Sequence, residues 1–436
     1  MRSMGIKQFA LGIIDKLPIG LQHIIYKTVI ETGLLVFRIK WVLRNPDTPD
    51  PSRIYWVSPE RIKYHTNYLP NKKTETVPFR DRAIRPPTLR GKVLDGDWDI
   101  SDYEFTDLDV YQSFKKRFDD GAKWQDTDFY KRVLGQVESG DFVWDLKNKD
   151  DLDNRFKFLD SLYESIKNNG YRLSRTNYDK NISFDEIDVN IGRNGDYLFQ
   201  NGVHRLSIAK ILGVKYVPVM VFVRHKEWQA FRKYVFSYAQ EGGGKLYQPI
   251  VHPDLADIPY DQYAHNYQDL MAAIEHHLGK KTGVMLDLGA NQGFFCHKFE
   301  DLGYRCYAVE NDPVVFRILQ KVKIAENKKF RAINKSIFDV EFIKKMEFDV
   351  VLALNVFHHF LKTKRDFLQL IYLLKNLKTS EMYFEPHIYE EDQMKGAYTN
   401  LNETEFIDFI LQYTALTTSE IIYTAKSGRH VFKLSK

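Results

Sequence analysis

Residues 284–293, with the sequence Val-Met-Leu-Asp-Leu-Gly-Ala-Asn-Gln-Gly, constrain the fold of this chain more than any other segment. An apolar run leads to Asp287 and is followed by a turn that contains Gly289 and Gly293. This pattern predicts a strand, a glycine turn and a helix that begins near Phe294, as in the nucleotide-binding units of doubly wound α/β domains. Glycine suits such a turn because the backbone bends there and lies close to a ligand.

A second carboxylate follows further along the chain. Residues 307–310 form the next predicted strand, and this strand ends in Glu310, 23 residues after Asp287. A carboxylate in that place can accept hydrogen bonds from both ribose hydroxyls of a bound nucleoside. Together the two segments predict a nucleoside-binding α/β domain.

The motif D-x-G-x-x-x-G with its distal glutamate resembles that of the class I S-adenosylmethionine-dependent methyltransferases, and the resemblance covers residues 267–436. It implies a Rossmann-like domain with S-adenosylmethionine as the cofactor. The glycine loop would hold the amino-acid end of the cofactor, and the glutamate its ribose. The cofactor-binding residues that the resemblance implies are Asp287, Gly289, Asn291, Gly293, Glu310 and Asn355.

Two further predicted strands, residues 348–355 and 381–386, lead to the catalytic candidates of this domain. His358 follows the first strand and is a candidate base, since histidine titrates near neutral pH. Glu385 ends the second strand and is a candidate for holding a hydroxyl or amine acceptor. For both residues a structural role is the alternative. No metal site is predicted, because the adjacent rings of His358 and His359 would point apart in a helix.

The methyl acceptor is predicted to be a small molecule or a glycan with a free hydroxyl. Asn355 is not followed by the Pro-Pro-aromatic sequence that amino-methylating DNA enzymes carry. Residues 355–360, Asn-Val-Phe-His-His-Phe, are more similar to small-molecule and glycan O-methyltransferases. A nucleic-acid methyltransferase is the alternative, and a steep dependence of binding on salt would indicate it.

A second motif lies in the N-terminal half of the chain. Residues 197–199 form a predicted strand, followed by a Gly-x-His-Arg turn, a short helix and another strand at residues 216–223. Basic side chains beside the free N–H groups of a helix N-terminus suit the binding of phosphate. The candidate phosphate-binding residues are Gly202, His204 and Arg205. The alternative is that His204 and Arg205 cap the helix and pair with nearby aspartates.

This arrangement resembles the α+β fold shared by ParB N-terminal domains, sulfiredoxin and the free serine kinases. The resemblance implies binding of ATP or another nucleoside triphosphate with Mg²⁺. Val203 stands where sulfiredoxins carry a reactive cysteine, which argues against sulfiredoxin chemistry. Kinase activity requires a carboxylate that positions the acceptor or the metal, and Asp97, in the acidic turn at residues 95–99, is the candidate.

Turn signals and composition divide the chain into four predicted segments. They are a helical extension with a proline-rich linker (1–52), a nucleotide-phosphate-binding domain (53–240), a linker (241–266) and the methyltransferase-like domain (267–436). Only two cysteines occur, Cys296 and Cys306, so no disulfide framework is expected and a reducing cytoplasm is predicted.

Charge is concentrated at the N-terminus. Residues 1–44 hold seven basic and two acidic side chains, an excess equal to the net charge of +5 of the whole chain. The rest of the chain is therefore balanced, which argues against a nucleic-acid partner. Residues 17–44 are also rich in large apolar side chains. They form either an amphipathic helix at a membrane surface or a helical hairpin packed on the following domain.

The predicted protein is therefore a two-domain cytoplasmic enzyme. In one interpretation the N-terminal domain phosphorylates the acceptor that the C-terminal domain methylates. In the other, the N-terminal domain binds a nucleotide without chemistry and regulates the methyltransferase. Release of ADP in the presence of a hydroxylated acceptor would distinguish them.

Overall fold

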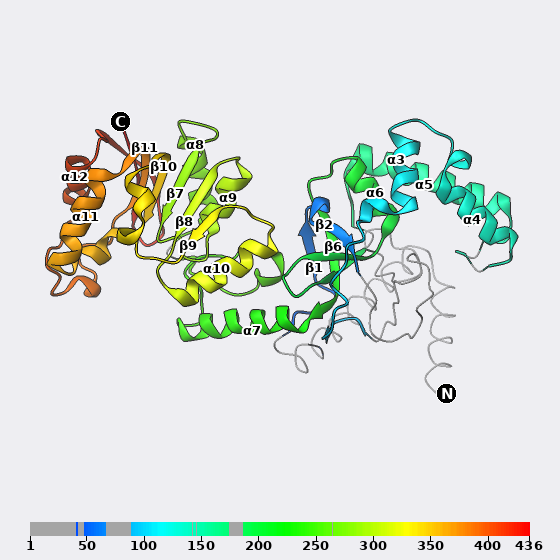
Figure 1. Cartoon of the computed structure of the whole chain (residues 1–436), viewed down its shortest axis with the longest axis horizontal. Helices are drawn as coiled ribbons and strands as arrows, with labels where there is room; N and C mark the ends of the chain where they lie inside the picture. The colour runs from blue at the N-terminus through cyan, green and yellow to red at the C-terminus, as the bar shows by residue number, and fades with distance from the viewer. Residues whose placement is uncertain are drawn as a thin grey trace, which may run out of the picture. The chain divides into compact units, whose positions relative to one another are not determined.

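The computed structural model describes residues 41, 48–66, 89–141, 143–144, 146–173, 186–263 and 265–436. The chain divides into two compact units, Met1–Phe231 and Arg232–Lys436, called here the N-terminal and C-terminal units (Figure 1). Helix α7 (Lys226–Glu241) contains the boundary. Except for Trp41, the predicted segment 17–44 lies outside the described residues. No helix of the described ranges is long and apolar enough to cross a membrane.

The N-terminal unit is built on a mixed sheet with the strand order β1-β6-β4-β5-β2, and β3 pairs with β6. Strands β3 and β4 run parallel to β6, whereas β1 is antiparallel to it. Every residue of β6 is buried, as expected of a continuous apolar run at the centre of a sheet. The strands are β1 (Ile54–Val57), β2 (Ile62–His65), β3 (Lys92–Leu94), β4 (Ile187–Ile191), β5 (Tyr197–Asn201) and β6 (Val217–His225).

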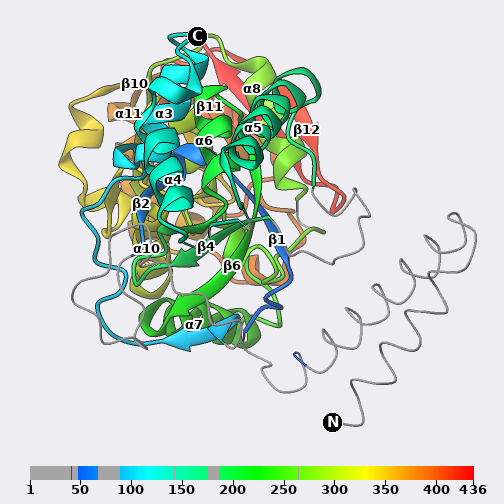
Figure 2. The same ribbon diagram turned by 90° about the vertical axis from the view of Figure 1, so that its right-hand side faces the viewer.

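Four helices of this unit gather around an aromatic core (Figures 1 and 2). Phe114, Trp124, Phe129 and Phe156 lie at its centre, with neighbouring ring centroids about 5 to 6 Å apart as aromatic pairs prefer. The helices are α3 (Asp109–Phe118), α4 (Asp128–Glu138), α5 (Lys149–Asn169) and α6 (Val203–Ile211). The predicted order of strand, turn, short helix and strand around Gly202 is present as β5, α6 and β6.

The C-terminal unit contains a seven-stranded sheet with the order β12-β13-β11-β10-β7-β8-β9. The five strands from β11 to β9 are parallel, and β13 is antiparallel to β11. The chain builds outward from β7 through β8 and β9, then returns to place β10 on the other side of β7. The carboxyl ends of β7 and β10 therefore flank the topological switch point, where ligands bind in doubly wound sheets.

The predicted strands of this unit are confirmed to within a few residues. The sheet consists of β7 (Val284–Leu288), β8 (Arg305–Val309), β9 (Arg331–Ile333), β10 (Glu347–Leu354), β11 (Lys378–Glu385), β12 (Thr418–Thr424) and β13 (His430–Ser435). The helices are α8 (Tyr267–His277), α9 (Phe294–Asp301), α10 (Pro313–Ala325), α11 (Lys364–Asn376) and α12 (Glu403–Tyr413). Together they form the expected Rossmann-like α/β architecture.

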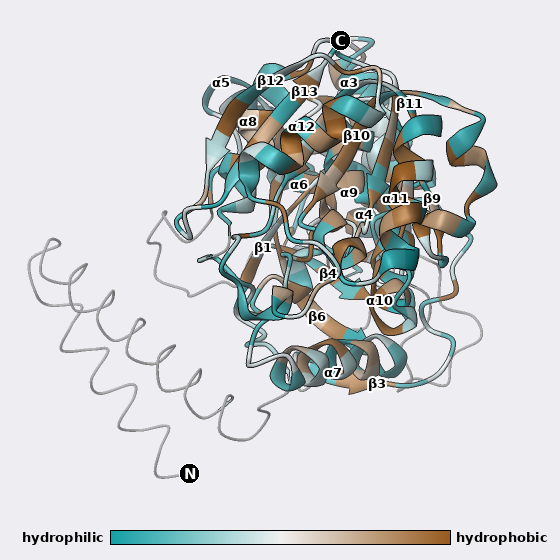
Figure 3. Cartoon of the chain, turned by 90° about the vertical axis from the view of Figure 1, so that its left-hand side faces the viewer, coloured by the Kyte–Doolittle hydropathy of each residue, from teal (hydrophilic) through white to brown (hydrophobic). Residues whose placement is uncertain are grey.

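Hydrophobic clusters cover both faces of this sheet. Along β10, Val350 and Leu352 belong to the cluster that contains α8 and α9, whereas Val351 and Ala353 belong to the cluster that contains α11 and α12. This alternation follows from the two-residue period of a strand. Figure 3 shows the apolar strands enclosed by helices. Burial on both faces leaves the ends of the strands as the place for polar side chains.

Candidate functional site

The turn after β7 has the backbone geometry that its glycines predict. Gly289 and Gly293 both have positive φ, at 75° and 83°, and Gly293 is the N-cap of α9. The N–H groups of Gly289 and Ala290 both donate to the carbonyl of Val309, at 2.9 and 3.0 Å. A Cβ at Gly289 would lie 3.0 Å from Cγ2 of Val356, so the turn approaches the loop after β10 closely.

Glu310 follows β8 and faces the same turn. Its carboxylate accepts a hydrogen bond from the N–H of Asn291 at 2.9 Å and another from the N–H of Asp312 at 2.9 Å. Burial raises the pKa of Glu310, and these two backbone donors oppose the shift. The structure therefore brings together Glu310 and Asn291, two of the residues assigned to the cofactor from the sequence, with Asn291 at a positive φ of 51°.

Asp287 is a buried carboxylate with little compensation. In the described part of the chain, the thiol of Cys296 donates to its Oδ2 at 3.7 Å. Burial raises the pKa of Asp287 to about 7. A carboxylate buried without a cation is costly, and an ammonium group beside it would remove that cost. The site thus fits the amino-acid end of S-adenosylmethionine.

A segment ahead of α8 contacts the loops after β7 and after β10. The N–H of Gln248 donates to Oε1 of Gln292 at 3.3 Å, and Nδ2 of Asn355 donates to the hydroxyl of Tyr247 at 2.9 Å. Burial raises the pKa of this tyrosine. Tyr247 lies within the predicted linker and was not expected from the sequence to be near Asn355.

Glu385, the last residue of β11, is fully buried and lies between two basic side chains. Nε2 of His265 is 3.1 and 3.0 Å from its carboxylate oxygens, and Nη1 of Arg429 is 3.6 Å away. The carbonyl of Glu385 accepts a hydrogen bond from the N–H of Asn355 at 3.2 Å. Sequence reasoning identified Glu385 and Asn355 but neither His265 nor Arg429.

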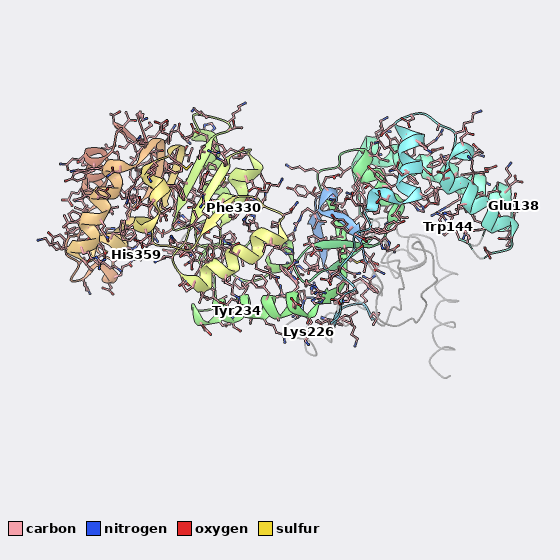
Figure 4. The ribbon with its side chains drawn as sticks, in the orientation of Figure 1. Glu138, Trp144, Lys226, Tyr234, Phe330 and His359 are labelled. Carbon is pink, nitrogen blue, oxygen red and sulfur yellow. The ribbon has the colours of Figure 1, made fainter. Side chains whose placement is uncertain are left out.

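His358 lies in the 3-10 helix η10 (Phe357–Leu361), next to His359 (Figure 4). Both nitrogens of its ring are buried and have no hydrogen-bond partner among the described residues. Burial, together with His359 and His387, lowers the pKa of His358 to about 3. This corrects the expectation of a pKa near neutrality, on which the assignment as a base rested. A direct part of His358 in the reaction stays a prediction.

In the N-terminal unit, Gly202 has a φ of 91° and is the N-cap of α6 without a side-chain cap. The ring of His204 is stacked on Phe114 at 5.7 Å and lies 5.5 Å from the ring of Trp144. Burial and nearby arginines, Arg205 among them, lower the pKa of His204 to about 3. His204 is therefore uncharged, which corrects the expectation that it offers a positive charge to a phosphate.

Asp97 lies in an exposed turn, as the sequence predicts, and its carboxylate is 2.8 Å from Nη2 of Arg193. The same guanidinium bonds the buried Asp99 at 2.7 Å. The negative charge of the acidic turn is therefore partly neutralised by Arg193, an arginine of the same unit. Among the described residues no group of three histidine, cysteine or acidic side chains has the arrangement of a metal site.

Comparison with known proteins matches residues 286–375 to the model of a methyltransferase domain. None of the curated proteins matches the chain. Three solved structures show distant similarity. The bifunctional kinase-methyltransferase WbdD is 19% identical over 46% of each chain, with a TM-score of 0.37. The N-terminal domain of EvdMO1 with SAH bound is 14% identical over 47% of this chain and 96% of that one, with a TM-score of 0.34.

A SAM-dependent methyltransferase from Archaeoglobus fulgidus is 13% identical over 40% of this chain and 97% of that one, with a TM-score of 0.31. The similarity to WbdD spans less than half the length of that protein. The matched residues 286–375 run from β7 to α11 and include the glycine turn, Glu310 and Asn355. Residues 286–375 of the C-terminal unit therefore match a methyltransferase domain.

Proposed function

We propose that the C-terminal unit transfers the methyl group of S-adenosylmethionine to a hydroxyl of a small molecule or glycan. The observation that carries the proposal is the pair of carboxylates at the switch point. Asp287 is buried and forms no ion pair with the described residues, and Glu310 lies across the glycine turn from it. In this proposal Asp287 binds the ammonium group and Glu310 the ribose hydroxyls of the cofactor. The bound cofactor supplies an electrophilic methyl group on a sulfonium.

The chain's own contribution to transfer is positioning and exclusion of water. Asn355, at the end of β10, is held by the carbonyl of Glu385 and by the hydroxyl of Tyr247. Residues 247 and 248 contact the loops on both sides of the switch point, so they help to enclose it. The buried polar groups beside Asn355 favour an acceptor that forms hydrogen bonds, such as a hydroxyl.

The experiment is methyl transfer from S-adenosylmethionine with a radioactive methyl group. The full-length protein is incubated with a panel of oligosaccharides and polyols and, in parallel, with DNA and RNA. Transfer to a hydroxylated compound supports the proposal. Calorimetry on the same protein gives the affinity for the cofactor. If S-adenosylmethionine does not bind, the proposed function is contradicted. If only nucleic acid is methylated, and its binding falls steeply with salt, the protein is a nucleic-acid methyltransferase instead.

A second function is proposed for the N-terminal unit, the binding of a nucleoside triphosphate. Arg132, Arg155 and Arg205 all act electrostatically on the ring of His204 at the start of α6. Arg132 is paired with Asp109. Arg205, however, stands in the first turn of α6, whose N-terminus has no side-chain cap, and this combination favours an anion such as a phosphate. Binding of ATP, CTP or GTP with Mg²⁺ tests this function. Release of ADP that requires a hydroxylated acceptor supports phosphorylation of that acceptor, and binding without release supports regulation.

A further inference from the structure

His265 is a buried histidine that stands just before α8. It is 2% exposed, and its Nε2 lies 3.1 and 3.0 Å from the two carboxylate oxygens of Glu385. Its other ring nitrogen, Nδ1, is also buried and has no hydrogen-bond partner among the described residues. One nitrogen of this ring is therefore held by a carboxylate while the other is left without a partner.

The carboxylate determines where the ring hydrogen lies. An ionised carboxylate only accepts hydrogen bonds, so Nε2 carries the hydrogen and Nδ1 of the neutral ring keeps its lone pair. A buried polar atom without a partner costs about 1–3 kcal/mol, and such atoms call for a ligand or a water. Nδ1 is therefore available to accept a proton or a hydrogen bond from a bound molecule.

The two candidate histidines of the C-terminal unit differ in what surrounds them. In the described part of the chain the ring nitrogens of His358 have no hydrogen-bond partner. Its ring lies 4.0 Å from that of His359 and 5.5 Å from that of His387, and its pKa is lowered to about 3. His265 has Glu385, with Arg429 beyond it and the rings of Tyr267 and Tyr423 at 5.5 and 6.0 Å. A positive charge on the imidazole is stabilised by a carboxylate in direct contact. His265 thus has a carboxylate on one ring nitrogen and a buried, open Nδ1 on the other side of the ring.

His265 also belongs to the cluster around the end of β10. The backbone carbonyl of Glu385 accepts a hydrogen bond from the N–H of Asn355. The side-chain Nδ2 of Asn355 donates to the hydroxyl of Tyr247. The hydroxyl of Tyr267, two residues after His265, donates to the carbonyl of Tyr247 at 3.0 Å. In a doubly wound sheet this end of the strands is where the reacting groups meet.

We propose that His265 accepts the proton of the acceptor hydroxyl through Nδ1, and that Glu385 is the residue that positions its ring. The inference rests on the proposed function, since it assigns the base of that reaction. The hydroxyl oxygen forms a bond to the methyl carbon while the carbon–sulfur bond breaks and its electron pair goes to sulfur. The hydroxyl proton moves to Nδ1, and the imidazolium beside Glu385 later releases it to water.

The experiment is nitrogen NMR of the full-length, deuterated protein with ¹⁵N-labelled histidine rings. His265→Gln identifies the resonances of His265, and His276→Gln, an exposed histidine of α8, is the matched control. We expect a neutral ring with hydrogen on Nε2 and a bare Nδ1. A ring that carries its hydrogen on Nδ1 overturns the proposal, because that atom then has no lone pair to accept a proton.

The same sample is then saturated with S-adenosylmethionine labelled with ¹³C in the methyl group. In the reacting complex the base lies about 3 Å from the acceptor oxygen, and that oxygen lies about 3 Å from the methyl carbon. The base is therefore at most about 6 Å from the methyl carbon. We therefore expect a nuclear Overhauser effect between the methyl group and the ring proton next to Nδ1. Binding without this effect overturns the inference alone, whereas no binding of the cofactor overturns the proposed function.

Glu385→Gln tests the positioning residue. The amide keeps the shape of the side chain but can offer either a donor or an acceptor to Nε2. We expect the ring of His265 to change from one tautomer to a mixture, a change that loss of packing alone does not produce. An unchanged tautomer in this variant overturns the part assigned to Glu385.

Discussion

The buried carboxylate of Asp287 makes the stability of the C-terminal unit depend on pH. Burial raises its pKa from 3.8 to about 7. A tenfold change in an equilibrium constant is about 1.4 kcal/mol, so ionising Asp287 costs about 4 kcal/mol more in the folded than in the unfolded chain. The folded chain binds the proton more tightly, and the free energy of unfolding therefore falls as pH rises from about 4 to about 7. Between pH 5 and pH 8 we expect a fall of about 3 kcal/mol.

Asp287→Asn removes this charge and keeps the shape of the side chain. Relative to the wild type, the variant should gain about 3 kcal/mol of stability between pH 5 and pH 8. Its affinity for S-adenosylmethionine should fall by about 1.5–3 kcal/mol, the range for a hydrogen bond to a charged group. The affinity of the wild type should rise several-fold from pH 6 to pH 7.5, as Asp287 ionises. The same substitution should thus stabilise the folded unit and lower its affinity for S-adenosylmethionine.

The chain offers a probe that follows the C-terminal unit alone. Its only cysteines, Cys296 and Cys306, are both buried in this unit, whereas all six tryptophans precede Arg232. A thiol reagent labels the native protein more slowly than the unfolded chain at the same pH. The ratio of the two rates is the equilibrium constant for opening of the unit, and its logarithm gives the free energy of opening. Tryptophan fluorescence reports the N-terminal unit and should not respond to Asp287→Asn.

Asp408→Asn, an exposed aspartate of α12, is the matched control and should keep the pH slope of the wild type. Equal slopes for the wild type and Asp287→Asn would refute the account of a buried, uncompensated carboxylate. Equal affinity of the two proteins for S-adenosylmethionine would separately refute its contact with the ammonium group. Calorimetry at each pH makes this second comparison.

Four further outcomes are expected. Glu310→Ala should weaken the binding of S-adenosylmethionine by about 1–3 kcal/mol in calorimetry, and equal affinity would exclude its contact with the ribose. Gly289→Ala should also weaken it, since the new Cβ is strained at positive φ and lies 3.0 Å from Val356. Arg205→Ala should abolish binding of a nucleoside triphosphate but leave cofactor affinity unchanged, because the sites lie in separate units; loss of both would contradict this. If residues 17–44 bind membranes, deleting residues 1–44 abolishes liposome flotation at an unchanged melting temperature, whereas a lower melting temperature without flotation indicates packing.

Local patterns predicted four of the five parallel strands of the C-terminal unit, and missed the short strand β9. Residues 284–286 and 350–354 are continuous apolar runs within β7 and β10, and each strand is followed by a turn that ends it. Helix α5 has a local signal of the same kind, since its buried residues recur at helical spacing through Phe156, Leu159 and Ile166. These features depend on neighbours within a few residues, and a single sequence contains that information.

The protonation of the two predicted histidines could not be read in the same way. His204 and His358 are uncharged because distant segments bury them, and burial disfavours the charged ring. For His204 the rings that surround it come from α3 and α4 and from residue 144. A motif shows which residue type stands at a turn, but the packing of the whole unit determines its charge.

Two of the residues missed in the C-terminal site, Tyr247 and His265, share one cause. Tyr247 meets Asn355 across 108 positions, and His265 meets Glu385 across 120. Both precede the recognisable motif, in the segment predicted to be a linker because three glycines open it. Its composition argued otherwise, since tyrosines recur up to residue 267 and flexible linkers are rich in glycine and serine. Tyrosine combines a large apolar ring with a hydroxyl, which favours sites where a wall is both packed and polar. A tyrosine-rich stretch ahead of a nucleotide-binding motif is therefore better interpreted as part of the wall of that site.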